Sequence, residues 1–411
     1  MGRNDATAGG YRWVVLAVLW LTLLVSYFDR VAIAAALPFM RVDLGLSPTE
    51  MGLVSGALLL SYTLVLVPAG YLSDRIGQRR VIAVAILWWT VFSVLTGAVT
   101  EGALLLVAVR FLMGAGEGFH PPPLWRMLAN WFPHGRRSVP LALMLTALTL
   151  GPALAPSVVL PVVSTWGWRW VFYLTAIPGV ITVLLVVRYL RDAPGHRDLV
   201  TRIAPAAGLD GRRRWWVPHI WLTFAAFFFF GFVLYGLMSW LPTYLITYRG
   251  LGLGAAGLLA TTPYLAGTVG LLVGGAVCER YFNHVRRRFI AIGYLATAAC
   301  IVAAVLVPTV AGTGIFLTLA GFFLYSGLGP FWSVPMDVVA PHEVGLWLGF
   351  INMGTQLAGF IGPVVIGAIL QSTGSFTPVL GTMIGSMVLA AACLSAVRAP
   401  VAVASDEAVP A

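Results

Sequence analysis

Long apolar stretches recur along the whole of this 411-residue chain, and they restrict its fold more than any other feature. Twelve of them approach or exceed the roughly 20 residues that an α-helix needs to cross a bilayer. They fall at residues 13–39, 51–72, 81–99, 102–124, 138–163, 171–190, 219–241, 255–277, 289–309, 314–336, 346–370 and 377–397. Charged residues make up 10% of the chain, against about 25% in a soluble domain. The sequence therefore predicts an all-α polytopic membrane protein with twelve transmembrane helices, and it excludes a soluble enzyme, a disordered chain and a disulfide scaffold.

The arginines predict how these helices are oriented. All 25 basic residues are arginines, and with a cytoplasmic N-terminus 19 of them fall at cytoplasmic positions. Only Arg41, Arg169 and Arg249 then lie on the outer side. Because basic residues are concentrated in cytoplasmic loops, we expect both termini in the cytoplasm and a multi-pass protein of the cytoplasmic (inner) membrane.

The basic charge has other possible meanings, which its distribution excludes. The formal net charge is +10, but the arginines cluster between apolar runs, and no basic-aromatic module for nucleic acid is present. Without lysine the chain cannot form a Schiff base, and its three cysteines lack metal-ligand spacing. We expect no catalytic site, no metal and no cofactor other than a proton as coupling ion. The expected partners are the lipid bilayer and a small substrate, with no nucleic acid.

The chain divides near its middle. Residues 191–218 form the longest polar stretch, which predicts a cytoplasmic linker between helical bundles at 1–190 and 219–411. A weak internal repeat supports this division, since the segment 70–75 returns as 275–280 at an offset of 205 residues. Two six-helix bundles related in this way are typical of secondary transporters, whose substrate site lies between the bundles near the middle of the membrane.

The sharpest motif is Gly-Tyr-Leu-Ser-Asp-Arg-Ile-Gly-Gln-Arg-Arg at residues 70–80. It resembles the signature of the major facilitator superfamily between the second and third helices. This resemblance covers the whole chain and implies the major facilitator fold, with the motif acting as a cytoplasmic gate. The residues so implied are Gly70, Asp74, Arg75, Gly77, Arg79 and Arg80, with Glu279 and Arg280 in the weaker second copy.

Two ionisable residues lie within the fourth apolar segment. Arg110 and Glu117 are seven residues apart, so on a helix they point the same way. Charged side chains inside a membrane are costly and normally face the protein interior or a wet cavity. One interpretation is a structural ion-pair network between helices. The other is a cavity in which Arg110 binds an anion and Glu117 takes up and releases a proton. The prolines at 121–123 predict that the helix breaks just after His120.

A third charged group, Tyr27-Phe28-Asp29-Arg30, interrupts the first apolar segment. Neighbours on a helix do not face each other, so Asp29 and Arg30 each need a different partner. The chain is similar to the anion:cation symporter branch of the superfamily at residues 27–30, 61–63, 110–117, 130–133 and 167–170. That resemblance implies proton-linked carboxylates at Asp29 and Glu117, and substrate contacts at Tyr27, Arg30, Tyr62 and Arg110.

In the second half, Asn352 and Gln356 are four residues apart and share one helix face. They are expected either to contact substrate or to form interhelical hydrogen bonds.

These features together predict a secondary active transporter, functional as a monomer, that takes up a small organic carboxylate with protons by alternating access. The alternative within transport is a proton-coupled antiporter or exporter of drugs or metabolites. A membrane receptor or polytopic enzyme is a third class, which the short loops and scattered histidines disfavour.

Overall fold

The computed structural model describes residues 4–132, 138–191, 218–336 and 344–397. Helices fill nearly all of these ranges, and the described residues contain no strand. In chain order the helices are α1 (Asn4–Leu44), α2 (Pro48–Ile76), α3 (Gln78–Ala98), α4 (Ala103–Gly118), α5 (Pro121–Trp131), α6 (Ser138–Trp166), α7 (Trp168–Tyr189), α9 (Pro218–Thr243), η1 (Tyr244–Tyr248), α10 (Leu253–Tyr281), η2 (Asn283–Val285), α11 (Arg286–Leu306), α12 (Val310–Ser326), α13 (Leu328–Phe331), α14 (Ser333–Met336), α15 (Val344–Thr373) and α16 (Thr377–Ala396). The described residues form twelve stretches long and apolar enough to span a membrane, as the sequence predicts.

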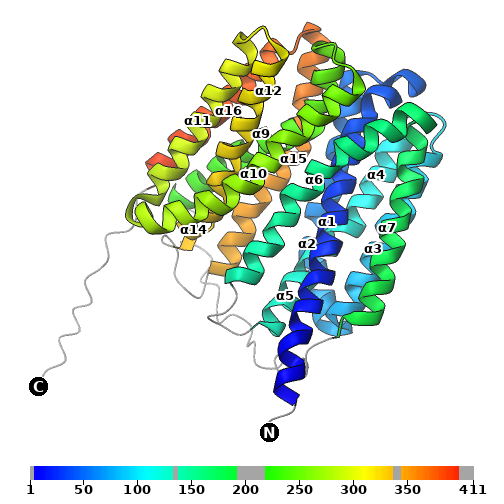
Figure 1. The fold of residues 1–411 in the computed structure, drawn as a ribbon, viewed down its shortest axis with the longest axis vertical. Helices are drawn as coiled ribbons and strands as arrows, with labels where there is room; N and C mark the ends of the chain where they lie inside the picture. Colours follow the sequence, from blue (N-terminus) through cyan, green and yellow to red (C-terminus); the bar gives the residue numbers. More distant parts are fainter. Residues whose placement is uncertain (1–3, 133–137, 192–217, 337–343, 398–411) are drawn as a thin grey trace, which may run out of the picture.

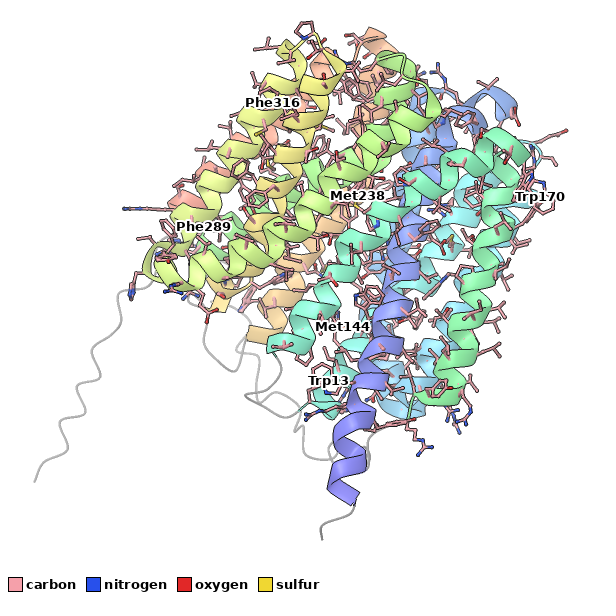
Figure 2. All side chains as sticks on the ribbon, in the orientation of Figure 1. Trp13, Met144, Trp170, Met238, Phe289 and Phe316 are labelled. Atoms are coloured by element: carbon pink, nitrogen blue, oxygen red, sulfur yellow. The ribbon has the colours of Figure 1, made fainter. Side chains whose placement is uncertain are left out.

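The outer surface of the molecule is apolar, as a surface in contact with lipid must be. Large apolar side chains are exposed on it: Leu104 is 81% exposed and Leu306 is 75% exposed. Exposed Trp13 and Trp170 lie toward opposite ends of the part formed by α1–α7 (Figure 2). Tryptophan favours the two membrane interfaces because its ring is apolar and its N–H is polar. The distribution therefore fits a helical body that crosses a bilayer.

The fourth span is broken where the sequence predicts a break. Helix α4 ends at Gly118 and α5 begins at Pro121, although together they form one apolar span, residues 103–131. Proline has no N–H to continue the helix, and its ring clashes with the preceding turn. The break leaves Glu117 in the last turn of α4, close to the middle of that span.

The helices assemble into two groups. In the first, α1 packs on α6 and α7, α2 on α4, and α3 on α7. In the second, α9 packs on α15 and α16, α10 on α12, and α11 on α12 and α16. The groups meet through α2 with α15, α6 with α10, and α1 with α9 (Figure 1). Residues 192–217, most of the expected linker, lie outside the described residues, so the domain boundaries given above stay a prediction.

Glycines allow α2 and α15 to touch near one end of the molecule. A Cβ atom on Gly52 or Gly56 would overlap the backbone carbonyl of Pro363 or Phe360 respectively. The same region holds a hydrogen bond from Thr49 to Gln371. These contacts lie in the first third of α2. The two helix groups are therefore in close contact at the end of the molecule where α1 leads into α2.

Candidate functional site

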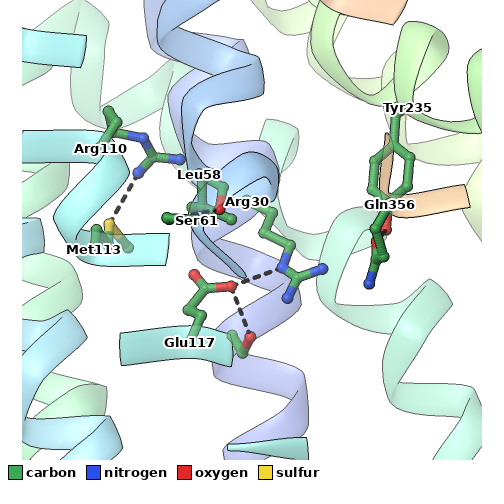
Figure 3. Close-up of polar contacts among 9 residues, drawn as sticks. Arg30, Leu58, Ser61, Arg110, Met113, Glu117, Tyr235 and Gln356 are labelled. Atoms are coloured by element: carbon green, nitrogen blue, oxygen red, sulfur yellow. Dashed lines mark hydrogen bonds and ion pairs between the residues drawn. The ribbon is translucent and has the colours of Figure 1, made fainter. Parts of the chain in front are cut away.

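The centre of the site is an ion pair between the first and fourth spans. Arg30 Nε on α1 lies 2.7 Å from Glu117 Oε2 on α4 (Figure 3). The exposed fraction of these side chains is 6% for Arg30 and 0% for Glu117. Arg30 therefore pairs with a carboxylate on another helix and not with its neighbour Asp29, because adjacent residues on a helix do not face each other.

Two tyrosine rings hold the guanidinium group of Arg30. Its Cζ atom is 4.6 Å from the ring centroid of Tyr27 and 4.7 Å from that of Tyr62. Tyr27 is almost one helical turn before Arg30 on α1, whereas Tyr62 comes from α2. Aromatic faces attract cations, so the two rings help to fix the position of the guanidinium group.

One nitrogen of this guanidinium group is left for a ligand. Arg30 Nη1 is buried and has no hydrogen-bond partner among the described residues. Figure 3 shows the guanidinium group directed toward Tyr235 and Gln356 of the second helix group. A buried N–H donor without an acceptor is costly, and this donor is suited to an incoming anion.

Ser26 is a site residue that the sequence analysis does not identify. Its hydroxyl donates to Glu117 Oε2 at 3.2 Å. Since Ser26 is four residues before Arg30 on α1, the shared helix face is the signal that would have placed it here. Glu117 Oε2 thus has two donors, while its Oε1 is buried with no partner among the described residues.

Asp29 and Arg110 are two further buried charged residues that interact with Glu117. Arg110 is 1% exposed, and its Nη1 donates to Met113 Sδ at 3.0 Å. Figure 3 shows Arg110 on the side of Glu117 that faces away from Gln356. Asp29 is 4% exposed and interacts electrostatically with Glu117 and Arg110. Neither Asp29 Oδ1 nor Arg110 Nε has a hydrogen-bond partner among the described residues. The formal charges of Asp29, Arg30, Arg110 and Glu117 sum to zero.

The second helix group contributes an amide to the same region. The hydroxyl of Tyr235 on α9 donates to Gln356 Oε1 on α15 at 2.8 Å, and both side chains are buried. Asn352, one turn earlier on α15, is half-buried. Tyr235 is not among the site residues predicted from the sequence, because its partner lies 121 residues further along the chain.

His120 belongs to a separate contact. Its Nε2 lies 2.8 Å from Thr22 Oγ1, and its ring meets Trp89 edge-on at 5.3 Å between centroids. It is buried and packs between α1 and α3. Within the described residues, no three His, Cys, Asp or Glu side chains gather in a way that could hold a metal ion.

The motif at residues 70–80 forms the turn from α2 to α3. Gly77 has a φ of 94°, which only glycine adopts readily, and Gly70 faces Pro122. Arg75 lies 4.3 Å from the Tyr71 ring centroid, Arg79 donates to the carbonyl of Val187 on α7, and Arg80 is exposed.

The side chain of Asp74, at the centre of this motif, is outside the described residues. In the second copy, at the end of α10, Glu279 and Arg280 are exposed, and Arg280 lies 5.5 Å from the Tyr281 ring centroid. The gating role of both copies stays a prediction.

Known proteins resemble this chain over nearly its whole length. The probable sulfoacetate transporter of Cupriavidus necator is 30% identical over 385 residues, which is 89% of each chain. The hexuronate transporter of Bacillus subtilis is 30% identical, covering 88% of this chain and 89% of its own. The D-galactonate transporter of Escherichia coli is 27% identical, and the match covers 92% of this chain and 93% of that one. All three are named as transporters of organic anions.

A solved structure has the same fold. The crystal structure of a bacterial homolog of the human lysosomal transporter Spinster, inward-facing and occupied, superposes with a TM-score of 0.77 at 20% identity. The match covers 94% of this chain and 96% of that one. The model of the Major Facilitator Superfamily matches residues 19–363 and 254–410. The chain is thus a multi-pass membrane transporter rather than an enzyme, and it belongs to the Major Facilitator Superfamily.

Proposed function

We propose that the chain is a proton-coupled symporter that takes up a small organic carboxylate by alternating access. The proposal rests on the residues that surround the Arg30 side chain. Its guanidinium group is buried between Tyr27 and Tyr62 and bonded to Glu117 through Nε, and its Nη1 has no hydrogen-bond partner in the described part of the chain. A fixed arginine with an unused N–H binds a carboxylate strongly because the hydrogen bonds are charge-assisted.

Coupling to protons follows from competition for Arg30. A substrate carboxylate that binds the guanidinium group weakens its hold on Glu117. A carboxylate that loses its cation in low-dielectric surroundings is neutralised by a proton. Substrate and proton then enter together, and the loaded site has the same net charge as the empty one. Asp29, close to Glu117 and Arg110, is the second proposed proton-linked group.

The proposal also includes the topology, the cellular location and the oligomeric state of the protein. We place both termini in the cytoplasm because 19 of the 25 arginines then lie on that side. The proposed location is the plasma membrane, in keeping with the bacterial relatives, and one chain is the functional unit. The proton is the only coupling ion and no cofactor takes part.

Uptake by proteoliposomes tests the proposal. Purified protein is reconstituted and offered labelled hexuronate, sulfoacetate or galactonate, the compounds named for the relatives. An inward proton gradient should drive accumulation of at least one of them, and Arg30→Gln should abolish it. Arg169→Gln is the matched control, because Arg169 is partly exposed and pairs with Asp43 away from the site.

The result that contradicts the proposal is gradient-driven accumulation that Arg30→Gln leaves unchanged. Accumulation under an outward gradient alone would instead support the antiporter.

A further inference from the structure

The hydrogen bond between Tyr235 and Gln356 fixes what the second helix group offers to a ligand. A glutamine amide has one oxygen acceptor and an NH2 group with two donors. The Tyr235 hydroxyl donates to the oxygen at 2.8 Å, in a buried contact between α9 and α15. This bond turns the Gln356 oxygen toward Tyr235, so the Nε2 group, with its two N–H donors, is directed away from Tyr235.

On the first helix group, the guanidinium group of Arg30 also offers a donor. Arg30 Nη1 is buried without a partner among the described residues, and a guanidinium group has no acceptor. Figure 3 shows Gln356 on the side of the Arg30 guanidinium group that faces away from Arg110. A ligand that touches both helix groups thus meets donors at each end.

We propose that Tyr235 is a positioning residue that keeps Gln356 a hydrogen-bond donor, and that the site thereby selects acids carrying a second acceptor group, such as another carboxylate or a sulfonate. This inference rests on the proposed function, because it requires that Arg30 hold the first carboxylate. An acid whose far end is apolar or cationic leaves the Gln356 amide unpaired, which lowers its affinity. If the Tyr235–Gln356 bond only tied α9 to α15, ligand preference would not depend on it.

Three acids of similar length separate these possibilities. Succinate ends in a second acceptor, butyrate ends in a methyl group, and 4-aminobutyrate ends in a cationic donor. Their dissociation constants are measured by titration calorimetry on the full chain in lipid nanodiscs. The wild-type protein should bind succinate at least about tenfold more tightly than butyrate, and it should bind 4-aminobutyrate no more tightly than butyrate.

Two variants test the role of Tyr235, and one serves as their control. Tyr235→Phe removes only the hydroxyl, so the amide is free to rotate and the preference for succinate should fall severalfold while butyrate binding stays the same. Gln356→Glu places an acceptor where the donor was, so 4-aminobutyrate should become preferred over succinate. Tyr294→Phe is the control, because Tyr294 is also buried in the second group but its hydroxyl has no partner among the described residues. It should leave all three constants unchanged.

Each failure has a distinct meaning. A succinate preference that survives both Tyr235→Phe and Gln356→Glu overturns the inference, as does equal binding of succinate and butyrate by the wild-type protein. In both cases the proposed function stands as long as binding is lost in Arg30→Gln. Carboxylate binding that does not depend on Arg30 overturns the proposed function as well.

Discussion

Glu117 accepts a hydrogen bond from Arg30 at 2.7 Å across 87 residues of sequence, inside the first helix group. This pair joins the first and fourth spans at a point where both side chains are almost wholly buried. Any anion that binds Arg30 must therefore compete with Glu117. Substrate binding at Arg30 therefore changes the hydrogen bonding of the Glu117 carboxylate.

Glu117→Gln should separate transport from the proton gradient. Glutamine keeps the shape and an acceptor oxygen for Arg30 but cannot exchange a proton. Labelled substrate should still exchange across the membrane in proteoliposomes, whereas an imposed proton gradient should no longer concentrate it inside. Undiminished gradient-driven accumulation in this variant would exclude Glu117 as the coupling group.

Asp29→Asn should tighten anion binding and slow turnover. Removing one negative charge leaves the four-residue charge cluster positive, and a charge interaction in a protein with an effective dielectric constant of about 20 is on the order of 1–2 kcal/mol. We expect a roughly tenfold lower dissociation constant together with a lower maximal uptake rate. Asp43→Asn, at a half-exposed site, is the control. Weaker binding in Asp29→Asn would contradict the prediction.

Glu117→Ala should destabilise the protein more than removal of the whole ion pair. Breaking a buried pair leaves an uncompensated charge, at a cost of about 3–5 kcal/mol, whereas an apolar replacement of both partners is often neutral. The thermal unfolding temperature of purified Glu117→Ala should therefore be lower than that of the double variant Arg30→Met with Glu117→Met. A double variant that unfolds at or below the temperature of Glu117→Ala would count against a desolvated pair.

Gly56→Leu should hold apart the end of the molecule where α2 meets α15. A Cβ atom on Gly56 would lie 2.7 Å from the Phe360 carbonyl oxygen, so a leucine cannot fit without separating the helices. Transport should be lost, and a cysteine at Ser55, whose hydroxyl is buried, should react faster with a membrane-impermeant maleimide. Gly254→Leu is the control, since no other described residue outside its own helical turn has an atom within 4 Å of the position of its Cβ atom. Equal labelling rates in the two variants would show that this contact does not close the pathway.

Some features of the site could be predicted from the sequence alone, and others could not. The break at Pro121 is confirmed because it depends only on the local geometry of proline. The need of Asp29 and Arg30 for separate partners follows from the helix period, and the structure pairs Arg30 with another helix. The sequence did not identify the partner of Glu117: Arg110 shares a helix face with Glu117, yet the ion pair in the structure joins Glu117 to Arg30. Choosing between two arginines requires knowing which helices are adjacent.

The fold class, the twelve spans and the presence of buried charges were determined by the sequence itself, because hydrophobicity, helix period and proline act over a few residues or one span. The tertiary structure decided which nitrogen of Arg30 lacks a partner among the residues that the structure describes, and that Ser26 donates to Glu117. It also decided that Tyr235 engages the oxygen of Gln356. Such pairings join atoms on different helices, up to 121 residues apart, and only the packing of those helices brings them within hydrogen-bond distance.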